Sequence, residues 1–233
     1  MIDWHSHILP KMDDGSRSVE ESIAMLHLQK SQGADVVLAT PHFYANEETV
    51  DEFLERRGRC FNNLSASLDA DCPRVLCGAE VRYYPGISNM EGLERLAIEG
   101  TNVLLLEMSM TKWTEYTVKE LVELASTKGL TIVMAHIERY MDIQGESTFI
   151  RLLNSGMLMQ VNSTFFSGFF NKRKAIKLLD LGKIHLIGSD AHNTTSRAPK
   201  LDSAYELIEK NFGQEYLSQM DEFGKELLGI KKI

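Results

Sequence analysis

The feature that most constrains this fold is the alternation of short apolar runs with amphipathic segments along the 233-residue chain. Each run is almost continuously apolar, which favours parallel strands that are buried on both faces. Seven strands are predicted on this basis: Met1–Trp4, Val36–Ala39, Val75–Ala79, Val103–Leu106, Thr131–Ala135, Met157–Val161 and Ile184–Ile187.

Four of the intervening segments have the pattern of a helix that stops at glycine. Residues 18–33 begin with Ser18 and Glu21, the pattern of a capping box, and end at Gly33. The other three are 117–129, 147–156 and 172–182, and residues 201–229 predict two closing helices. No linker or change of composition interrupts the alternation. We therefore expect one α/β domain over residues 1–233, a barrel close to a TIM barrel but one unit short.

Metal-ligating residue types follow six of the seven predicted strands. They are His5 and His7, His42, Glu80, Glu107, His136, and Asp190 with His192. The sixth strand ends without one and offers Gln160, Asn162 and Ser163 instead. In a closed parallel barrel the carboxyl ends of all strands meet at one rim, where active sites of this architecture lie. Five of the seven histidines are at these ends, so we expect them to converge.

A rim that holds five histidines and three carboxylates without lysine or arginine partners carries a large desolvation cost, which divalent cations would remove. Eight ligands, with Asp14 as a ninth, exceed what one ion needs. We therefore predict two or three ions with a bridging carboxylate such as Glu80. Imidazole and carboxylate ligands together suit manganese, iron or zinc. The spacing leaves the choice between Asp13 and Asp14 open, and Asp14 is also a candidate to orient a histidine ligand.

Two arginines follow predicted ligands on rim loops, Arg139 after His136 and Arg197 after His192. A guanidinium group there can hold a phosphate with two hydrogen bonds and stabilise charge in a transition state. The alternative for Arg139 is a salt bridge with Glu138. Six aromatic residues also follow strand ends and are candidates for a substrate-facing wall or for ordinary packing: Phe43, Tyr44, Tyr83, Tyr84, Trp113 and Tyr140.

Composition excludes several classes of function. A net charge of −8 argues against nucleic-acid binding through a basic surface. The three cysteines form neither a disulfide framework nor a paired zinc motif, which indicates a reducing, cytoplasmic setting. We expect no signal peptide and no direct membrane insertion, because polar Asp3, His5 and His7 come first and no apolar run approaches 18 residues.

The stretches DWHSH, DDG, TPH, AHIERY, QVNS and GSDAHN resemble motifs of the polymerase-and-histidinol-phosphatase (PHP) superfamily. The resemblance is closest to its capsular-polysaccharide branch, the CpsB/CapC/YwqE-like tyrosine-protein phosphatases, and runs from Met1 to about Pro199. It implies a distorted (βα)7 barrel of the PHP type with a trinuclear metal centre that usually contains manganese. Iron, zinc and magnesium are the alternative metals.

By motif position, the resemblance carries metal-ligand roles to His5, His7, Asp14, His42, Glu80, Glu107, His136, Asp190 and His192. Arg139 and Arg197 match proposed phosphate-holding arginines, and we expect them to act in catalysis together with Asp14. One departure is that Glu47 and Glu48 follow His42 where the branch tends to carry basic residues. This departure weakens the expected docking of an anionic, tyrosine-rich tail.

The function implied is a metal-dependent protein-tyrosine phosphatase of capsule and exopolysaccharide biosynthesis that uses a metal-activated hydroxide. Its expected partner is a membrane tyrosine kinase of polysaccharide export. The alternatives are a small-molecule phosphatase of the histidinol-phosphate type, a phosphodiesterase with the same metal centre, and a non-enzymatic kinase-partner module. An amidohydrolase-like reaction is disfavoured, because no lysine stands at a strand end.

Overall fold

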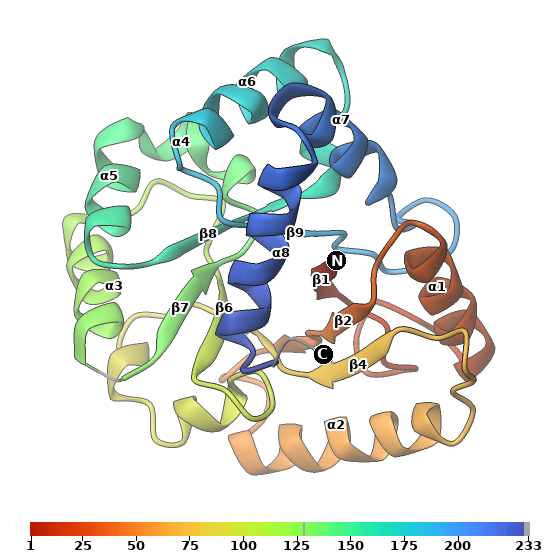
Figure 1. Cartoon of the computed structure of the whole chain (residues 1–233). Coiled ribbons are helices and arrows are strands. Elements are labelled where there is room, and N and C mark those ends of the chain that lie inside the picture. Colours follow the sequence, from red (N-terminus) through yellow and green to blue (C-terminus); the bar gives the residue numbers. More distant parts are fainter. Residues whose placement is uncertain (128, 231–233) are drawn as a thin grey trace.

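Parallel strand segments form the centre of the protein (Figure 1). The computed structural model describes residues 1–127 and 129–230. Within these residues the strands are β1 (Ile2–Ser6), β2 (Val36–Ala39), β3 (His42–Phe43), β4 (Arg74–Cys77), β5 (Glu80–Arg82), β6 (Val103–Glu107), β7 (Thr131–Met134), β8 (Leu158–Asn162) and β9 (Leu186–Gly188). All seven predicted strands are present.

Two of the predicted strands are bent into pairs of segments. Pro41 separates β2 from β3, because proline has no N–H to donate to the ladder. Gly78 and Ala79 separate β4 from β5. His42 and Glu80 therefore begin short second segments instead of ending their strands, and these segments pair in register with each other.

Strand order follows chain order once the bent pairs are joined. One sheet has the order β1-β2-β4 and the other β3-β5-β6-β7-β8-β9, and every pair is parallel. The two edges meet where Asp190 N donates to His5 O (2.8 Å) and His7 N donates to Ala191 O (2.9 Å). The expected distorted, seven-stranded barrel is confirmed.

Helices surround this sheet (Figure 1). They are α1 (Val19–Ser31), α2 (Val50–Ser65), α3 (Glu115–Thr127), α4 (Met141–Gln144), α5 (Glu146–Asn154), α6 (Phe169–Asp180), α7 (Asp202–Phe212) and α8 (Gln214–Leu227). The four helix–glycine units and the two closing helices are confirmed, whereas α2 was not among the predicted units. None of the helices in the described residues is both long enough and apolar enough to span a bilayer.

Two local predictions need correction. The connection from β5 to β6 contains only the short 3₁₀ turns Ile87–Asn89 and Leu93–Leu96, so this unit lacks an α-helix. The capping box of α1 is half formed. Ser18 Oγ accepts from Glu21 N at 3.2 Å, but the Glu21 carboxylate accepts from Arg17 N at 2.8 Å, one residue before the cap.

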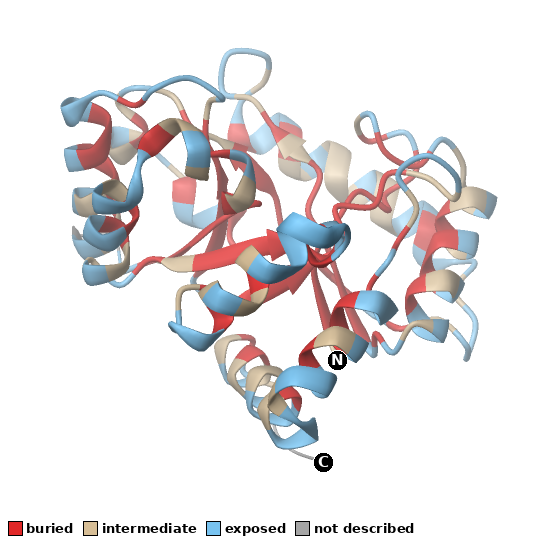
Figure 2. Cartoon of the chain, turned by 90° about the horizontal axis from the view of Figure 1, so that it is seen from above, coloured by how far each residue is buried: buried red, intermediate tan, exposed pale blue. Residues whose placement is uncertain are grey.

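The barrel interior is polar at the carboxyl-end rim and apolar towards the other end of the strands. Alternate residues of a strand face the same side. Val103 and Leu105 lie in the interior apolar cluster, and Glu107 continues their row at the rim. Leu186 lies in the same cluster, two residues before Gly188 and four before Asp190. Most strand residues are buried, with Arg74 at the start of β4 exposed, and the other exposed residues are on the surrounding helices and loops (Figure 2).

Strand β1 departs from this simple alternation. Ile2 and Trp4 belong to the interior apolar cluster, yet the odd-numbered His5 and His7 reach the polar rim. The pairing register of β1 with β2 shifts between Asp3 and Ser6. Such an irregularity changes which residues of a strand face inward, and it brings both histidines to the rim.

We predict that Gly188→Ala lowers the free energy of unfolding by about 1–3 kcal/mol, the usual cost of an overpacked core. A Cβ at Gly188 would lie 2.5 Å from His5 Cβ and 2.8 Å from His5 N, at the point where β9 meets β1. Urea denaturation measures the change. Gly58→Ala in α2 is the control. Its Cβ would meet nothing within 4 Å, so it should stabilise by up to about 1 kcal/mol. Equal effects of the two variants would contradict the close contact.

Candidate metal centre

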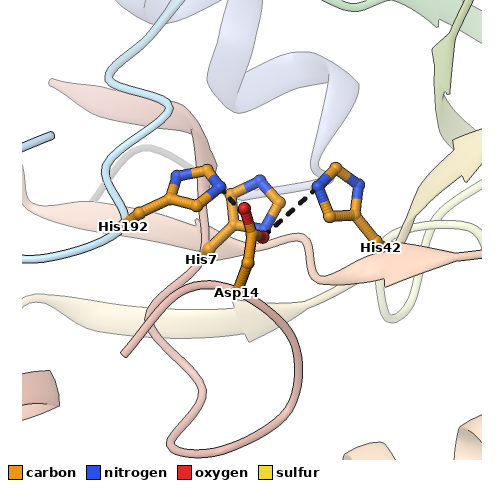
Figure 3. A group of neighbouring side chains, drawn as sticks. All are labelled: His7, Asp14, His42 and His192. Atoms are coloured by element: carbon orange, nitrogen blue, oxygen red, sulfur yellow. Dashed lines mark ion pairs between the residues drawn. The ribbon is translucent and has the colours of Figure 1, made fainter. Parts of the chain in front are cut away.

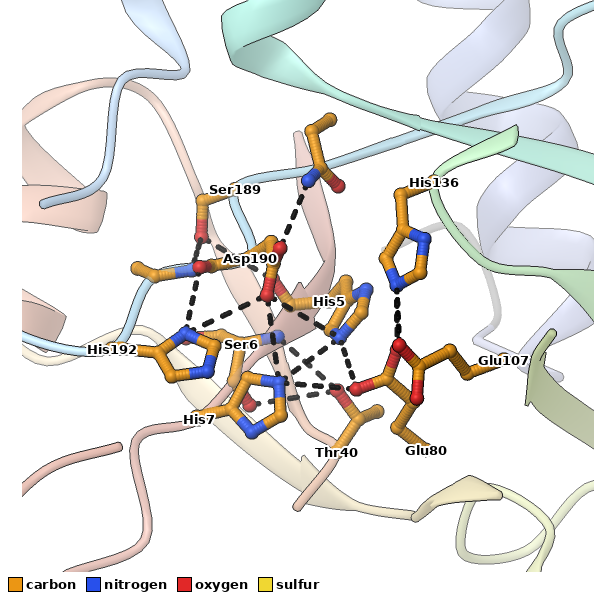
Figure 4. A network of polar contacts seen from close by, with 12 residues as sticks. His5, Ser6, His7, Thr40, Glu80, Glu107, His136, Ser189, Asp190 and His192 are labelled. Carbon is orange, nitrogen blue, oxygen red and sulfur yellow. Dashed lines mark hydrogen bonds and ion pairs between the residues drawn. The ribbon is translucent and has the colours of Figure 1, made fainter. Parts of the chain in front are cut away.

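The structure brings all nine predicted metal-ligand residues together at the carboxyl-end rim of the barrel (Figures 3 and 4). They come from segments far apart in the chain: β1 and its following loop, β3, β5, the end of β6, the turn after β7 and the loop after β9. Their ligand atoms form overlapping groups in which every pair of atoms lies within 4.8 Å. The predicted convergence is therefore present.

The first group contains His5, His7 and Asp190, with Glu80 beside it. The Nε2 atoms of the two histidines are 3.1 Å apart. Glu80 Oε2 lies 3.2 Å from His5 Nε2 and 3.3 Å from His7 Nε2, and Asp190 Oδ1 lies 3.8 and 3.5 Å from the same two atoms. Two imidazole nitrogens and two carboxylate oxygens thus face one point.

The second group lies around Glu80, which shares ligand groups with His5 and His136 and with His42 and Glu107. His136 Nε2 is 2.8 Å from Glu80 Oε1 and 3.7 Å from Glu107 Oε1. His42 Nδ1 approaches Glu80 Oε2 at 3.0 Å. Glu80 therefore borders two groups at once, which is the arrangement of a bridging carboxylate.

The third group contains Asp14, His42 and His192, with His7 beside it (Figure 3). Asp14 Oδ1 lies 3.5 Å from His42 Nε2 and 3.3 Å from His192 Nε2. The Asp14 side chain is exposed, whereas His192 is buried. This group is the most open to solvent.

Asp13 and Asp14 have different positions, which the spacing alone left undecided. Asp14 faces the histidines of the third group. Asp13 lies behind them: its Oδ2 contacts His7 Nδ1 at 2.7 Å and accepts from His42 N at 3.0 Å. Burial opposes ionisation of Asp13, but the contact with His7 outweighs it and keeps its pKa below the usual range. Asp13 is thus placed to orient His7, and Asp14 to offer an oxygen to an ion.

The loop that carries these acids needs glycine at position 15. A Cβ on Gly15 would lie 2.2 Å from His7 O and 2.5 Å from His7 Cβ. The loop returns against β1, and Ser16 N donates to His7 O at 3.0 Å. The DDG stretch is therefore explained by the close approach of this loop to the first strand.

Backbone strain is concentrated at two of the candidate ligands. Among the described residues, only three non-glycine residues have positive φ: Lys11, His136 (32°) and Asp190 (53°). Such left-handed conformations cost energy and persist where surrounding contacts fix them. His136 N donates to Gln160 Oε1 at 2.7 Å, and Asp190 N donates to His5 O at 2.8 Å. These hydrogen bonds hold the two side chains toward the rim.

The donor set fits divalent cations. His5 Nδ1 is buried and has no hydrogen-bond partner, and His42 Nδ1 and His192 Nε2 are buried and make no hydrogen bond with the carboxylate oxygens that lie 3.0 and 3.3 Å away. Burial and the neighbouring His7 lower the pKa of His192 to about 4. Its imidazole is therefore neutral at pH 7, the form that binds metals. Burial also opposes ionisation of Glu80, yet the facing His5, His136 and His42 lower its pKa well below the usual value. Burial opposes protonation of His5 and His7, but the facing Glu80 and Asp13 raise the pKa of these two imidazoles, so a bound cation would replace a proton there. The centre thus offers imidazole and carboxylate ligands, as Mn, Fe or Zn sites require.

Both predicted arginines lie at the mouth of the candidate metal centre, and both contact Asp190. Arg139 Nη2 pairs with Asp190 Oδ2, and Arg197 Nη2 lies 3.1 Å from Asp190 Oδ1. The described residues show no direct ion pair between Arg139 and Glu138, which was the alternative role for Arg139. The side chains of Arg139 and Arg197 are 36% and 42% exposed, so both can reach a bound substrate.

A third arginine at the rim, Arg82, was missed by the sequence analysis. Arg82 is opposite Glu107 in the β5–β6 register, and its Nη1 lies 2.8 Å from Glu107 Oε2. Glu107 therefore gives one oxygen to Arg82 and turns the other toward His136. The signal in the sequence was its position two residues after Glu80, which places both side chains on one face of β5.

Most of the aromatic candidates are packing residues. Phe43, Tyr83, Trp113 and Tyr140 are buried. Tyr140 Oη contacts His136 Nδ1 at 3.1 Å and so helps to orient that imidazole. Tyr44 is the aromatic residue beside the rim, with its ring centroid 5.4 Å from that of His42.

Comparison with known proteins agrees with this geometry. Residues 1–223 match the family model described as capsular polysaccharide synthesis, CpsB/CapC. The tyrosine-protein phosphatase YwqE of Bacillus subtilis is 31% identical, with 100% of this chain and 93% of the relative aligned. The tyrosine-protein phosphatase CpsB of Streptococcus pneumoniae is 33% identical, with 91% of each chain aligned.

Solved structures give the same picture. A chain from the crystal structures of YwqE from Bacillus subtilis and CpsB from Streptococcus pneumoniae, described as metal-dependent tyrosine phosphatases, superposes with a TM-score of 0.81. It is 28% identical, with 100% of this chain and 96% of that chain covered. An amidohydrolase at 10% identity and a TM-score of 0.53 shares the fold alone, with 99% of this chain and 74% of that chain covered. Because the family model spans residues 1–223 and both relatives align along nearly the whole chain, the protein belongs to the CpsB/CapC family of capsular polysaccharide synthesis.

Proposed function

We propose that this protein is a metal-dependent phosphomonoesterase that hydrolyses phosphotyrosine in a partner protein. The observation that supports this most directly is the overlap of three ligand groups at one rim, with two partly exposed arginines at its mouth. The relatives that align along the whole chain are named tyrosine-protein phosphatases, and the structural relative is described as metal-dependent.

The three groups would hold two or three divalent ions, for which we propose manganese. His5, His7, Asp190 and Glu80 would hold the first, His136, Glu80 and Glu107 the second, and Asp14, His42 and His192 the third. Ions clustered in this way supply a nucleophilic water at neutral pH and neutralise phosphoryl oxygens.

The protein's own side chains position the phosphate ester. The guanidinium groups of Arg139 and Arg197 bind two of its non-bridging oxygens and stabilise the charge that develops on them. Tyr44 borders the mouth beside His42, where the phenyl ring of the substrate would lie. In hydrolysis an oxygen of water bonds to phosphorus as the bond from phosphorus to the tyrosyl oxygen breaks. One proton of that water ends on the tyrosyl oxygen, which leaves an unphosphorylated tyrosine residue and inorganic phosphate.

A cysteine nucleophile is not required. Burial raises the pKa of Cys77 to about 12, so this thiol is not ionised at neutral pH. Burial also raises the pKa of Cys60 and of Cys72. We place the enzyme in the cytoplasm, since all three cysteines are free, and propose a membrane tyrosine kinase of polysaccharide export as its partner.

We predict manganese-dependent release of phosphate from a phosphotyrosine peptide, in preference to histidinol phosphate and to a bis-aryl phosphodiester. EDTA should abolish this activity, and added Mn²⁺ should restore it, because the side chains alone provide no nucleophile. A phosphate-release assay with the three substrates in parallel makes the comparison. Activity that persists after chelation would exclude the metal-dependent mechanism, and preference for either of the other substrates would reassign the substrate class.

We predict that Asp13→Asn weakens Mn²⁺ binding by about 10- to 100-fold, the usual effect of losing a group that orients a metal-bound histidine. The amide keeps the shape of the side chain but loses the charge that faces His7 Nδ1. Electron paramagnetic resonance titration of free Mn²⁺ measures binding without turnover. Asp51→Asn, which alters a surface ion pair with Arg95, is the matched control. Unchanged binding in Asp13→Asn would show that Asp13 does not orient a ligand.

We predict that Arg139→Ala lowers kcat/KM for the phosphotyrosine peptide by about 100-fold, the usual effect of losing one transition-state donor. Arg139→Lys should recover part of the loss, since lysine keeps the charge but not the two-pronged contact. Arg151→Ala removes an exposed arginine that pairs with Glu115 and serves as control. Steady-state kinetics at saturating Mn²⁺ would show no difference from the control if Arg139 did not bind the phosphate.

A further inference from the structure

The first turn of α6 presents an unusual aromatic pair to solvent. Phe169 and Phe170 are 68% and 83% exposed, the highest values among the large hydrophobic side chains of the described residues. Their rings meet edge to face at 5.5 Å, and Arg173 Cζ lies 5.1 Å from the centre of the Phe169 ring. Exposed aromatic rings with adjacent cations are typical of an interaction surface.

A basic groove continues from this pair. Lys172, Arg173 and Lys177 of α6 line a groove of about 510 Å³ whose other wall includes Leu207 and Phe212 of α7. Asp180 also lines the groove, so its lining has three cations and one anion and is positive overall, whereas the whole chain carries a net charge of −8. We call Phe169, Phe170, Lys172, Arg173 and Lys177 the α6 patch.

The first turn of α6, which carries Phe169 and Phe170, lies on the same side of the barrel as the candidate metal centre, and the groove leads from there along α6 and α7 towards their C-terminal ends. The preceding strand β8 ends at Asn162, whose Nδ2 donates to Asp190 Oδ2 at 2.9 Å. Phe169 is seven residues further along the chain, which spans at most about 25 Å. Lys174 Nζ also contacts Asp142 Oδ1 at 2.8 Å, and this contact ties α6 to the segment that follows Arg139.

The side of the rim formed by β3 and α2 has the opposite charge. A groove of about 860 Å³ there is lined by one cation, Arg95, and by five acids: Glu47, Glu48, Asp51, Glu52 and Glu91. In the strand order, β3 is separated from β8 by β9 and β1, close to the greatest separation that seven strands allow. An acidic polypeptide that leaves the centre is therefore repelled on one side and attracted on the other.

We propose that the α6 patch docks the acidic polypeptide segment that flanks the phosphotyrosine of the substrate. The phenyl rings pack against apolar or aromatic residues of that segment, and Lys172, Arg173 and Lys177 pair with its carboxylates. The groove between α6 and α7 is concave, so an extended chain can enter it, whereas a flat bilayer reaches only the protruding rings. This inference rests on the proposed function and adds where the substrate polypeptide binds.

The experiment uses two variants, Lys172→Glu/Arg173→Glu and Phe169→Ser/Phe170→Ser. Acidic residues suit the N-terminal turns of a helix, so the first variant should keep α6 intact. The control is Arg59→Glu/Lys119→Glu, which makes the same change of net charge on α2 and α3, away from α6 (Figure 1). Each is tested on phosphotyrosine peptides that carry an acidic block about eight residues before or after the tyrosine, on their glutamine-substituted counterparts, and on p-nitrophenyl phosphate.

We expect both α6 variants to lower kcat/KM for one of the acidic peptides by about tenfold, through a higher KM, with the charge effect reduced by salt. Activity on p-nitrophenyl phosphate and on the neutral peptides should change by less than about twofold. Fluorescence anisotropy of the unphosphorylated acidic peptide in EDTA measures docking without catalysis. It should show the same loss in the α6 variants and none in the control.

Two results would overturn the proposal. The first is an unchanged preference for acidic peptides, and unchanged peptide binding, in both α6 variants. The second is loss of binding to phosphatidylglycerol vesicles in the α6 variants with peptide binding and kinetics unchanged, which would make the α6 patch a lipid-binding surface. Failure of the proposed function would give a different result. The wild-type protein would then show no activity on any phosphotyrosine peptide, while the anisotropy measurement would still report on docking.

Discussion

The pairing of the first strand with the segment after the last strand is the constraint on which the centre depends. Hydrogen bonds from Asp190 N to His5 O and from His7 N to Ala191 O bring the two ends of the barrel sheet together. The buried carboxylate of Asp3 reinforces this seam, since it accepts from Ser189 N at 2.7 Å and from Gln29 Nε2 at 2.8 Å. Without the seam, His5 and His7 would not share a site with Asp190 and His192, which come from the other end of the chain.

The electrostatics of the rim follow from this closure. The closure brings carboxylates and imidazoles into contact. Burial of each group costs free energy, and contact with its neighbours lowers that cost. Glu80 stays ionised among imidazoles although it is fully buried. Arginines supply positive charge from the outside: Arg139 and Arg197 at Asp190, and Arg82 at Glu107. The mouth is therefore suited to an anion, and the interior to cations.

Much of the fold and most of the centre could be predicted because they depend on strand periodicity. Six of the seven apolar runs are followed by a ligand type, and parallel strands carry those ends to one rim. What could not be predicted depends on local geometry. Asp13 and Asp14 are adjacent, and only the return of their loop over Gly15 separates their roles. Arg82 acquires its role from the cross-strand register with Glu107. The register shift in β1, which turns His5 and His7 inward, leaves no compositional mark.

The seam between β1 and β9 also sets the order of events during synthesis. Residues 2–7 leave the ribosome long before their partner on one side, residues 188–191, which follows more than 180 positions later. Until then β1 has an unpaired edge, and an open edge of apolar strand is prone to intermolecular pairing. Closing so long a loop slows folding. A nascent chain of this protein therefore needs protection of its first strand until the last strand, β9, and the residues that follow it have emerged, and chaperone demand should be highest just before that point.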